Sequence, residues 1–286
     1  MVPVAGLGTR LLPATRSQPK EMLPVLDKPV VQYVVEELAA AGIERVLFVT
    51  GRRKRAIEDH FDVDPELPSL PPGEGVEILY TRQPRPAGLG DAVARGHGFA
   101  GDAPVVVAVG DSIIEPGPGD SPGSLVRRLV EAYFSADACA AIAVAAVPDA
   151  LVSRYGIVVP EAKVIAMRAQ SPAFLASTVL EKPDPSETQS RWAVMGRYVL
   201  GPSVLQALRH TPADASGEVQ LADALRAAIG AGERVVAVPL TAGERRHDIG
   251  TAAGYASVFV RYALRDPRFG EELRGQAAVL IADAGG

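Results

Sequence analysis

A glycine-rich segment near the start of the chain carries residues that could bind phosphate. Gly6 and Gly8 follow the apolar residues 2–4, which we expect to form a short strand. Glycines after a strand let backbone N–H groups approach phosphate oxygens without interference from a Cβ atom. Arg10 adds a fork of donors that matches phosphate geometry, and Lys20 adds a compact positive charge that could reach the same group. The segment therefore indicates a polyphosphate site.

Two common nucleotide-binding motifs do not fit this segment. A Walker loop requires a Gly-Lys-Ser/Thr sequence, which does not follow Gly8. A dinucleotide fingerprint requires a third glycine and an uninterrupted helix, whereas Pro13 and Pro19 interrupt the chain here. A Rossmann dehydrogenase is therefore disfavoured. Taken singly, the glycines are typical of ordinary turns, and Arg10 or Lys20 of solvated surface charge, so only the combination is informative.

An acidic residue stands where a buried strand is expected to end. Residues 104–109 are mostly valine, and Gly110-Asp111 follows them. Because an unpaired carboxylate is costly to bury, Asp111 either caps the next turn or binds a cation such as Mg²⁺. Mg²⁺ commonly takes one or two protein carboxylates together with substrate phosphate oxygens. Spacing alone does not identify the second carboxylate.

Short apolar runs that alternate with helical patterns must position these side chains. Strands are expected at residues 2–4, 45–50, 76–81, 104–109, 138–147 and 235–239, and loops at 62–75 and 117–123. Helices are expected at 30–41, 53–61, 90–100, 124–136, 204–208, 221–231 and from 251, and a hairpin between 156 and 181.

This alternation predicts an α/β fold. We expect a Rossmann-like, mostly parallel mixed sheet flanked by helices, with a small C-terminal extension of helix and strand. Ligands of such sheets bind at the carboxyl ends of the strands. The loops after residues 2–4, 76–81 and 104–109 should therefore hold the site.

The composition is that of an ordinary globular protein. The 286 residues are 48% hydrophobic, with a net charge of −5 and the single cysteine Cys139. This length suits one domain over 1–286. An acidic balance argues against nucleic acid, and one thiol allows no internal disulfide or zinc cluster. Without a signal peptide or a bilayer-spanning run, we expect a cytoplasmic protein with no membrane partner.

The glycine-rich segment is the first of a series of motifs that extends over nearly the whole chain. The series comprises Gly6-x-Gly8-Thr9-Arg10-Leu11-x-Pro13, Pro19-Lys20-Glu21-Met22-Leu23-Pro24, Gln83…Gly88-Leu89-Gly90, Gly110-Asp111, Glu181-Lys182-Pro183, Gly196-Arg197-Tyr198, Gly217-Glu218-Val219-Gln220-Leu221 and His247-Asp248-Ile249-Gly250. In content and order these motifs resemble the sugar-phosphate nucleotidylyltransferases, and within them the bacterial UTP–glucose-1-phosphate uridylyltransferases. The resemblance implies an enzyme that joins a nucleoside triphosphate to a sugar 1-phosphate with the help of Mg²⁺. It also implies a nucleotide-binding part at about 1–135 and a sugar-binding and C-terminal part at about 136–286.

The resemblance also implies a role for particular residues. Arg10 and Lys20 would be catalytic, and Asp111 and Asp248 would together hold Mg²⁺. The nucleotide would be bound by Ala5, Gly6, Gly8, Thr9, Glu21, Gln83, Gly88 and Asp111, with Gln83 and Gly88 at the pyrimidine edge. The sugar phosphate would be bound by Gly156, Glu181, Lys182 and Gly196, with Lys182 at its phosphate and Glu181 at the sugar hydroxyls.

The identity of the substrates stays open. Uracil and thymine differ by one methyl group, which contributes only about 1 kcal/mol in a pocket. Residues 83–88 and Gly110-Asp111-Ser112 resemble glucose-1-phosphate thymidylyltransferases, whereas Lys20-Glu21-Met22 favours the uridylyl branch. A glucose analogue as acceptor, dTTP as donor, and a catalytically silent regulator that binds nucleotide sugars are the alternatives. Relatives are commonly dimers or tetramers, so we expect a homo-oligomer.

Overall fold

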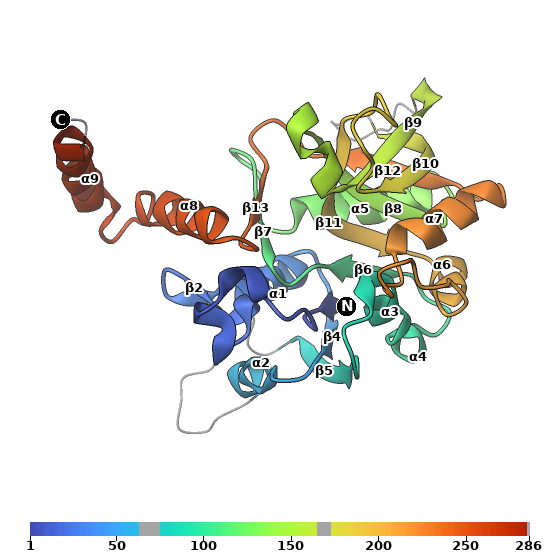
Figure 1. Cartoon of the computed structure of the whole chain (residues 1–286), viewed down its shortest axis with the longest axis horizontal. Helices are drawn as coiled ribbons and strands as arrows, with labels where there is room; N and C mark the ends of the chain where they lie inside the picture. The colour runs from blue at the N-terminus through green and yellow to red at the C-terminus, as the bar shows by residue number, and fades with distance from the viewer. Residues whose placement is uncertain (63–74, 165–172, 285–286) are drawn as a thin grey trace.

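The computed structural model describes residues 1–62, 75–164 and 173–284 (Figure 1). Its strands are β1 (Val2–Pro3), β2 (Pro24–Val25), β3 (Lys28–Pro29), β4 (Arg45–Thr50), β5 (Glu77–Arg82), β6 (Val105–Ala108), β7 (Ser112–Glu115), β8 (Ala140–Ala146), β9 (Gly156–Val164), β10 (Phe174–Glu181), β11 (Trp192–Leu200), β12 (Val235–Pro239) and β13 (Arg245–Asp248). Its α-helices are α1 (Val30–Ala40), α2 (Arg55–Phe61), α3 (Gly88–Ala94), α4 (His97–Ala100), α5 (Ser124–Ser135), α6 (Pro202–Leu208), α7 (Leu221–Gly230), α8 (Ala252–Ala263) and α9 (Gly270–Ala284). Short 3₁₀ helices include η1 (Thr9–Leu11) and η3 (Lys20–Met22). Most of the expected loop at 62–75 lies outside the described residues.

The strand β1 joins two sheets. On one side it belongs to a parallel sheet with the order β1-β4-β5. On the other side the N–H of Ala108 donates to the carbonyl of Met1 at 3.0 Å, and that of Gly110 to the carbonyl of Pro3 at 3.4 Å. These bonds connect β1 to the end of a six-stranded sheet with the order β6-β11-β8-β12-β10-β9. The central sheet therefore runs through the middle of the molecule (Figure 1).

The sheet is mixed, as expected. Its parallel pairs are β1–β4, β4–β5 and β8–β12. Antiparallel pairs enter through the β9–β10 hairpin, through β10 with β12, and through β11, which pairs with β6, β8 and β9. Among the described strands the antiparallel pairs outnumber the parallel ones, so the sheet is less parallel than expected. The hairpin confirms the expectation for 156–181, although its turn lies outside the described residues. The strand β11 was not anticipated, and it lies between β6 and β8.

Two apolar layers cover the two faces of the sheet. Alternate residues of a strand point to opposite faces, and β6 shows the consequence directly. Val105 and Val107 belong to the cluster that includes residues of α3, α6 and α7, whereas Val106 and Ala108 belong to the cluster that includes residues of α1 and α5. The nearly continuous valine run is thus explained by burial on both sides.

Other helices lie close to their expected positions. The helix expected at 90–100 is divided into α3 and α4, and α1 ends before Gly42, whose φ of +87° is typical of a residue after a helix. The C-terminal extension is present: α8 and α9 reach away from the sheet (Figure 1). Among the described helices, none has both the length and the apolar character needed to cross a membrane.

A small antiparallel ribbon, β7 with β13, lies beside the main sheet. Its register places Ser112 opposite Asp248 and Ile114 opposite Arg246. Sequence analysis did not anticipate either strand, because Arg245-Arg246-His247-Asp248 has no apolar alternation. This ribbon positions one half of the site described next.

Candidate functional site

A cavity of about 330 Å³ lies at the carboxyl end of β6 and between β9, β11, α7 and β13. Its walls include seven of the residues expected to act in the site, namely Arg10, Asp111, Gly156, Glu181, Lys182, Gly196 and Asp248. These residues come from both ends of the chain. The placement agrees with the rule that parallel sheets bind ligands at the carboxyl ends of their strands.

The two expected metal ligands lie on adjacent backbone segments. Asp248 ends β13 directly opposite Ser112, and the N–H of Ile249 donates to the carbonyl of Asp111 at 3.3 Å. Both carboxylates line the cavity. Asp111 is 21% exposed and Asp248 41% exposed. The resemblance predicted that Asp111 and Asp248 lie close together, and the pairing of β7 with β13 explains why they do.

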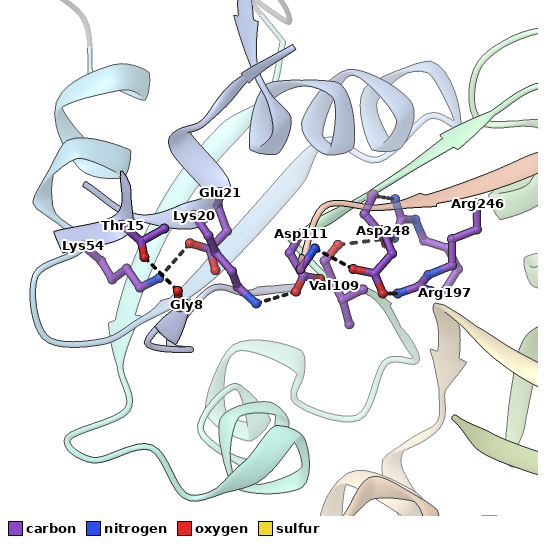
Figure 2. Close-up of polar contacts among 12 residues, drawn as sticks. Gly8, Thr15, Lys20, Glu21, Lys54, Val109, Asp111, Arg197, Arg246 and Asp248 are labelled. Atoms are coloured by element: carbon purple, nitrogen blue, oxygen red, sulfur yellow. Dashed lines mark hydrogen bonds and ion pairs between the residues drawn. The ribbon is translucent and has the colours of Figure 1, made fainter. Parts of the chain in front are cut away.

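Lys20 is bonded to Asp111. Its Nζ donates to Oδ2 of Asp111, and Figure 2 shows the ammonium pointing at that carboxylate. Burial by itself lowers the pKa of Lys20, but the charges of Asp111, Glu21 and Asp248 and the hydrogen bond to Asp111 together outweigh it, and the pKa is raised. Burial likewise opposes ionisation of Asp111, but Lys20 and Arg246 hold the pKa of that carboxyl below its usual value. Both groups are therefore charged at neutral pH.

Arg10 approaches the same place from the other side. Its Nη2 lies 3.1 Å from the position that a Cβ on Gly250 would occupy, and Oδ1 of Asp248 lies 2.9 Å from it. A side chain at residue 250 would thus collide with both groups. The N–H of Gly250 also donates to Oδ1 of Asp248 at 2.7 Å. Glycine therefore leaves room here for Arg10 and Asp248 to pack against the backbone.

The glycine-rich loop runs from β1 into η1. Gly8 adopts a φ of +67°, and its carbonyl accepts a bond from the hydroxyl of Thr15 at 2.7 Å. Ala5 is buried, whereas Gly6 and Thr9 are exposed. A Cβ on Gly6 would lie 3.7 Å from Nζ of Lys20. The loop therefore presents exposed backbone next to the Lys20 ammonium, as expected of a phosphate-binding segment.

Glu21 has a different environment from its neighbour Lys20. Its carboxylate accepts a bond from Nζ of Lys54 at 2.7 Å, and both side chains are at most 4% exposed (Figure 2). Burial raises the pKa of Glu21 and lowers that of Lys54. Glu21 is the buried residue of η3 and does not line the cavity. Its expected role in nucleotide binding stays a prediction.

Gln83 and Gly88 lie beside the main cavity rather than in its wall. The Gln83 amide is 4% exposed and donates to the carbonyl of Gly88 at 3.1 Å and to Oδ2 of Asp91 at 2.8 Å. The N–H of Gly90 donates to the carbonyl of Val219 at 2.9 Å. Gln83 thus fixes the loop that leads into α3, and its expected contact with a base stays a prediction.

The other wall carries the residues expected at the sugar phosphate. Lys182 has the uncommon φ of +43°, and its N–H donates to the carbonyl of Tyr155 at 3.1 Å. Its Nζ lies 2.9 Å from Oε1 of Glu181. Gly156 pairs with Glu181 across the β9–β10 hairpin, and Gly196 interrupts β11 with a φ of +75°.

Sequence reasoning missed several residues of the cavity. Arg246 lines it, and Nη2 of Arg246 donates to Oδ2 of Asp248 at 3.1 Å (Figure 2). Arg154 and Glu218 also line it. The position of Arg246 two residues before Asp248 was an available signal, because residues i and i+2 of a strand share a face.

The donor set fits a hard divalent cation. Asp111 and Asp248 offer carboxylate oxygens at one cavity, and Mg²⁺ prefers a few such ligands with phosphate and water completing its shell. Within the part of the chain that the structure describes, no group of three or more His, Cys, Asp and Glu could hold a metal. The site therefore suits a cation shared with a phosphorylated substrate rather than a closed structural metal site.

Fold and cavity together define an α/β protein whose cavity is lined by lysine, arginine and a pair of acids. Residues 1–264 match the family model described as nucleotidyl transferase. The chain belongs to the nucleotidyl transferase family.

Individual relatives agree with this assignment. A UTP–glucose-1-phosphate uridylyltransferase 2 of Staphylococcus saprophyticus is 39% identical, covering 96% of this chain and 94% of the relative. A UTP–glucose-1-phosphate uridylyltransferase 2 of Streptococcus pyogenes serotype M3 is 38% identical, covering 96% and 93%. The solved UTP-bound UGPase from Acinetobacter baumannii superimposes with a TM-score of 0.83 at 33% identity, covering 97% of both chains. A UDP-glucose pyrophosphorylase complexed with UDP-glucose gives 0.81 at 32% identity, covering 93% of this chain and 98% of the other. The resemblance to bacterial uridylyltransferases is confirmed.

Proposed function

We propose that this chain joins UTP to glucose 1-phosphate, forming UDP-glucose and releasing pyrophosphate. The observation that supports the proposal best is the meeting of Asp111 and Asp248 at one cavity, with Lys20 bonded to Asp111 and Arg10 beside Asp248. The names of the relatives, which are uridylyltransferases and UDP-glucose pyrophosphorylases, support the same substrates.

In this proposal the N-terminal segments bind the nucleotide. Arg10 and Lys20 contact the triphosphate and oppose the charge that develops on its phosphates. Exposed backbone of the glycine-rich loop donates to phosphate oxygens. The nucleotide-binding residues are Ala5, Gly6, Gly8, Thr9, Glu21, Gln83, Gly88 and Asp111.

The opposite wall binds the sugar phosphate. Lys182 neutralises its phosphate, and Glu181 accepts hydrogen bonds from sugar hydroxyls. Gly156 and Gly196 keep the backbone close to the ligand because neither carries a side chain. Lys182 and Glu181 form an ion pair and are therefore adjacent. One sugar phosphate can thus contact Lys182 through its phosphate and Glu181 through its hydroxyls.

The chemistry requires positioning more than proton transfer. A sugar 1-phosphate is largely dianionic at pH 7, so its oxygen can attack the α-phosphorus without a general base. The obstacle is repulsion between two polyanions, which Arg10, Lys20 and Lys182 reduce. Mg²⁺ held by Asp111 and Asp248 supplies further positive charge at the phosphates when it is bound.

A pyrophosphate-release assay tests the proposal. The wild-type protein is mixed with Mg²⁺, each of the four common nucleoside triphosphates or dTTP, and each of several sugar 1-phosphates. Turnover that is fastest with UTP and glucose 1-phosphate is the expected result. A preference for dTTP would assign the thymidylyltransferase activity, and a preference for another sugar would assign a glucose analogue. Binding of UDP-glucose without turnover of any pair would favour the silent regulator.

We also propose that the chain acts in the cytoplasm as a single domain and as a homo-oligomer, either dimer or tetramer. Residues of the proposed nucleotide side fall mainly in 1–135, and those of the sugar side in 136–286. The helix α9 exposes Val279, Leu280 and Ile281, which a second copy could cover. Light scattering after gel filtration tests the oligomer, and a monomeric mass would reject it.

A further inference from the structure

Arg246 is placed in the cavity by the register of the β7–β13 ribbon. Arg246 and Asp248 are two residues apart on β13, so their side chains leave the same face of the strand. Both line the cavity with Asp111 and Lys182. Arg245, the preceding residue, is on the opposite face and is exposed. Two neighbouring arginines therefore have different environments.

The guanidinium of Arg246 uses only part of its donor capacity. Nη2 donates to Oδ2 of Asp248 at 3.1 Å, and the guanidinium carbon lies 5.6 Å from the ring centre of Tyr155. Nε is buried and has no hydrogen-bond partner among the described residues. The side chain is 12% exposed. Buried guanidinium groups normally satisfy their donors, so the spare capacity indicates a ligand with acceptor oxygens.

Both carboxylate oxygens of Asp248 already accept hydrogen bonds. Its Oδ1 accepts the N–H of Gly250 at 2.7 Å, and its Oδ2 accepts Arg246. A divalent cation that takes Oδ2 would share this oxygen with the guanidinium, and the two positive groups would repel each other. Arg246 then needs another anion within reach of its side chain.

The nearest expected anion is the phosphate of the sugar. Arg246 lies over Tyr155, whose carbonyl accepts the N–H of Lys182 at 3.1 Å. Lys182 is the residue proposed to neutralise that phosphate. Arg246 and Lys182 therefore border the same wall of the cavity, and a planar fork suits a phosphate in bidentate contact.

We propose that Arg246 exchanges its partner during the reaction cycle: it pairs with Asp248 before the divalent cation binds, and with the phosphate of the sugar 1-phosphate afterwards. The proposal rests on the function proposed above. Because the cation frees Arg246 and the phosphate keeps it away from Asp248, each ligand strengthens binding of the other. Such coupling is reciprocal.

The test compares Arg246→Gln with Arg245→Gln, which removes the same charge from the opposite face of the strand. Free Mn²⁺ is titrated by electron paramagnetic resonance without substrates, and Asp248→Asn shows how much of the binding belongs to this site. Arg246→Gln should bind Mn²⁺ about 5-fold or more tightly than wild type, a typical size for coupled sites. Arg245→Gln should bind it as wild type does.

Steady-state kinetics supply the second readout. Arg246→Gln should raise KM for glucose 1-phosphate about 10-fold or more while KM for UTP changes little, as expected for loss of a charge-assisted contact. Arg246→Lys keeps the charge but not the fork, so it should bind Mn²⁺ as wild type does and raise KM less. Circular dichroism and the midpoint of thermal unfolding check that each variant is folded.

The outcomes separate the two proposals. Unchanged or weaker Mn²⁺ binding in Arg246→Gln, or the same tightening in Arg245→Gln, would overturn the partner exchange. The Mn²⁺ titration needs no turnover, so it remains readable if wild type fails to use UTP and glucose 1-phosphate. That failure would reject the proposed function instead.

Discussion

Arg197 and Glu37 form a buried ion pair directly behind the turn that carries Asp111. Nε of Arg197 lies 3.1 Å from both carboxylate oxygens of Glu37, and Nη2 lies 2.8 Å from one of them. The same guanidinium donates to the carbonyl of Val109 at 3.3 Å (Figure 2) and to that of Ser112 at 2.9 Å. Arg197 is fully buried. The pair therefore fixes the backbone on both sides of the acid that is proposed to bind the cation.

Removal of Arg197 should strongly destabilise the fold. Arg197→Met leaves the Glu37 carboxylate buried without its partner, which we expect to lower the free energy of unfolding by about 3–5 kcal/mol. Urea denaturation followed by circular dichroism measures the change. The double variant Arg197→Met/Glu37→Leu should recover a large part of the loss, because it leaves no buried charge. A loss below about 1 kcal/mol in the single variant would show that the pair contributes little.

Lys20→Ala should slow turnover without unfolding the protein. Its ammonium lies at the proposed triphosphate site, so we expect kcat to fall about 10²–10³-fold. Lys28→Ala is the matched control, since Lys28 pairs at 2.8 Å with Glu36, which has no proposed role in the site, whereas Lys20 pairs with Asp111. The control should keep a rate close to that of wild type. Full activity in Lys20→Ala would count against the proposed mechanism.

Asp111→Asn should weaken binding of the divalent cation. The substitution keeps the size of the side chain and removes the charge that Mg²⁺ prefers in its ligands. We expect most turnover to be lost, again about 10²-fold or more, and the Mg²⁺ concentration for half-maximal rate to rise. Initial rates over a range of Mg²⁺ concentrations measure both quantities. An unchanged Mg²⁺ requirement would exclude Asp111 as a ligand.

Gly250→Ala should impair activity through a collision within the site. The new Cβ would lie 2.9 Å from Oδ1 of Asp248 and 3.1 Å from Nη2 of Arg10. Because both groups must shift, we expect kcat/KM to fall about 10-fold or more. Gly98→Ala is the control: nothing lies within 4 Å of its Cβ position, and alanine favours the helix α4. Equal activity in both variants would contradict the close packing described here.

Acid should remove the contribution of Glu115 to stability. Hydrogen bonds from Arg261 and His247 lower the pKa of Glu115 from 4.5 to about 2. A carboxyl whose pKa is lower in the folded state stabilises the fold above its unfolded pKa, and this stabilisation is lost as the pH falls from about 4.5 towards 2. Glu115→Gln should therefore be less stable than wild type at pH 7.

The measurement is chemical unfolding of wild type and Glu115→Gln at several pH values between 7 and 3. The difference between them should shrink below about pH 4.5, by at most about 1.4 kcal/mol per pH unit for one proton. A difference that stays constant over this range would show that the ion pairs of Glu115 do not depend on its ionisation.

Much of the fold could be predicted from local patterns. The valine run of β6 predicted a strand buried on both faces, and Gly42 marked the end of α1, because burial and backbone conformation restrict these residue types. The ribbon of β7 and β13 could not be predicted, because both strands are only four residues long and β13 is polar. Its stability comes from pairing with a segment distant in the sequence.

The sequence predicted only part of the site, because tertiary contacts determine the rest. Motifs led to Arg10, Lys20, Asp111 and Asp248, and the structure brings these residues together. The sequence could not predict the buried ion pair between Lys54 and Glu21, because only the tertiary fold brings these two charges together. For the same reason, the sequence could not predict that Glu37 is the buried partner of Arg197.

The pairing of β7 with β13 also sets the order in which the protein matures. Asp111 is synthesised well before Asp248, yet the two acids become neighbours only when β13 docks against β7. A nascent chain that has exposed only the glycine-rich loop and Lys20 already carries the groups proposed for the nucleotide, but not the second acid. The proposed cation site is therefore complete only after β13 has been synthesised and has paired with β7.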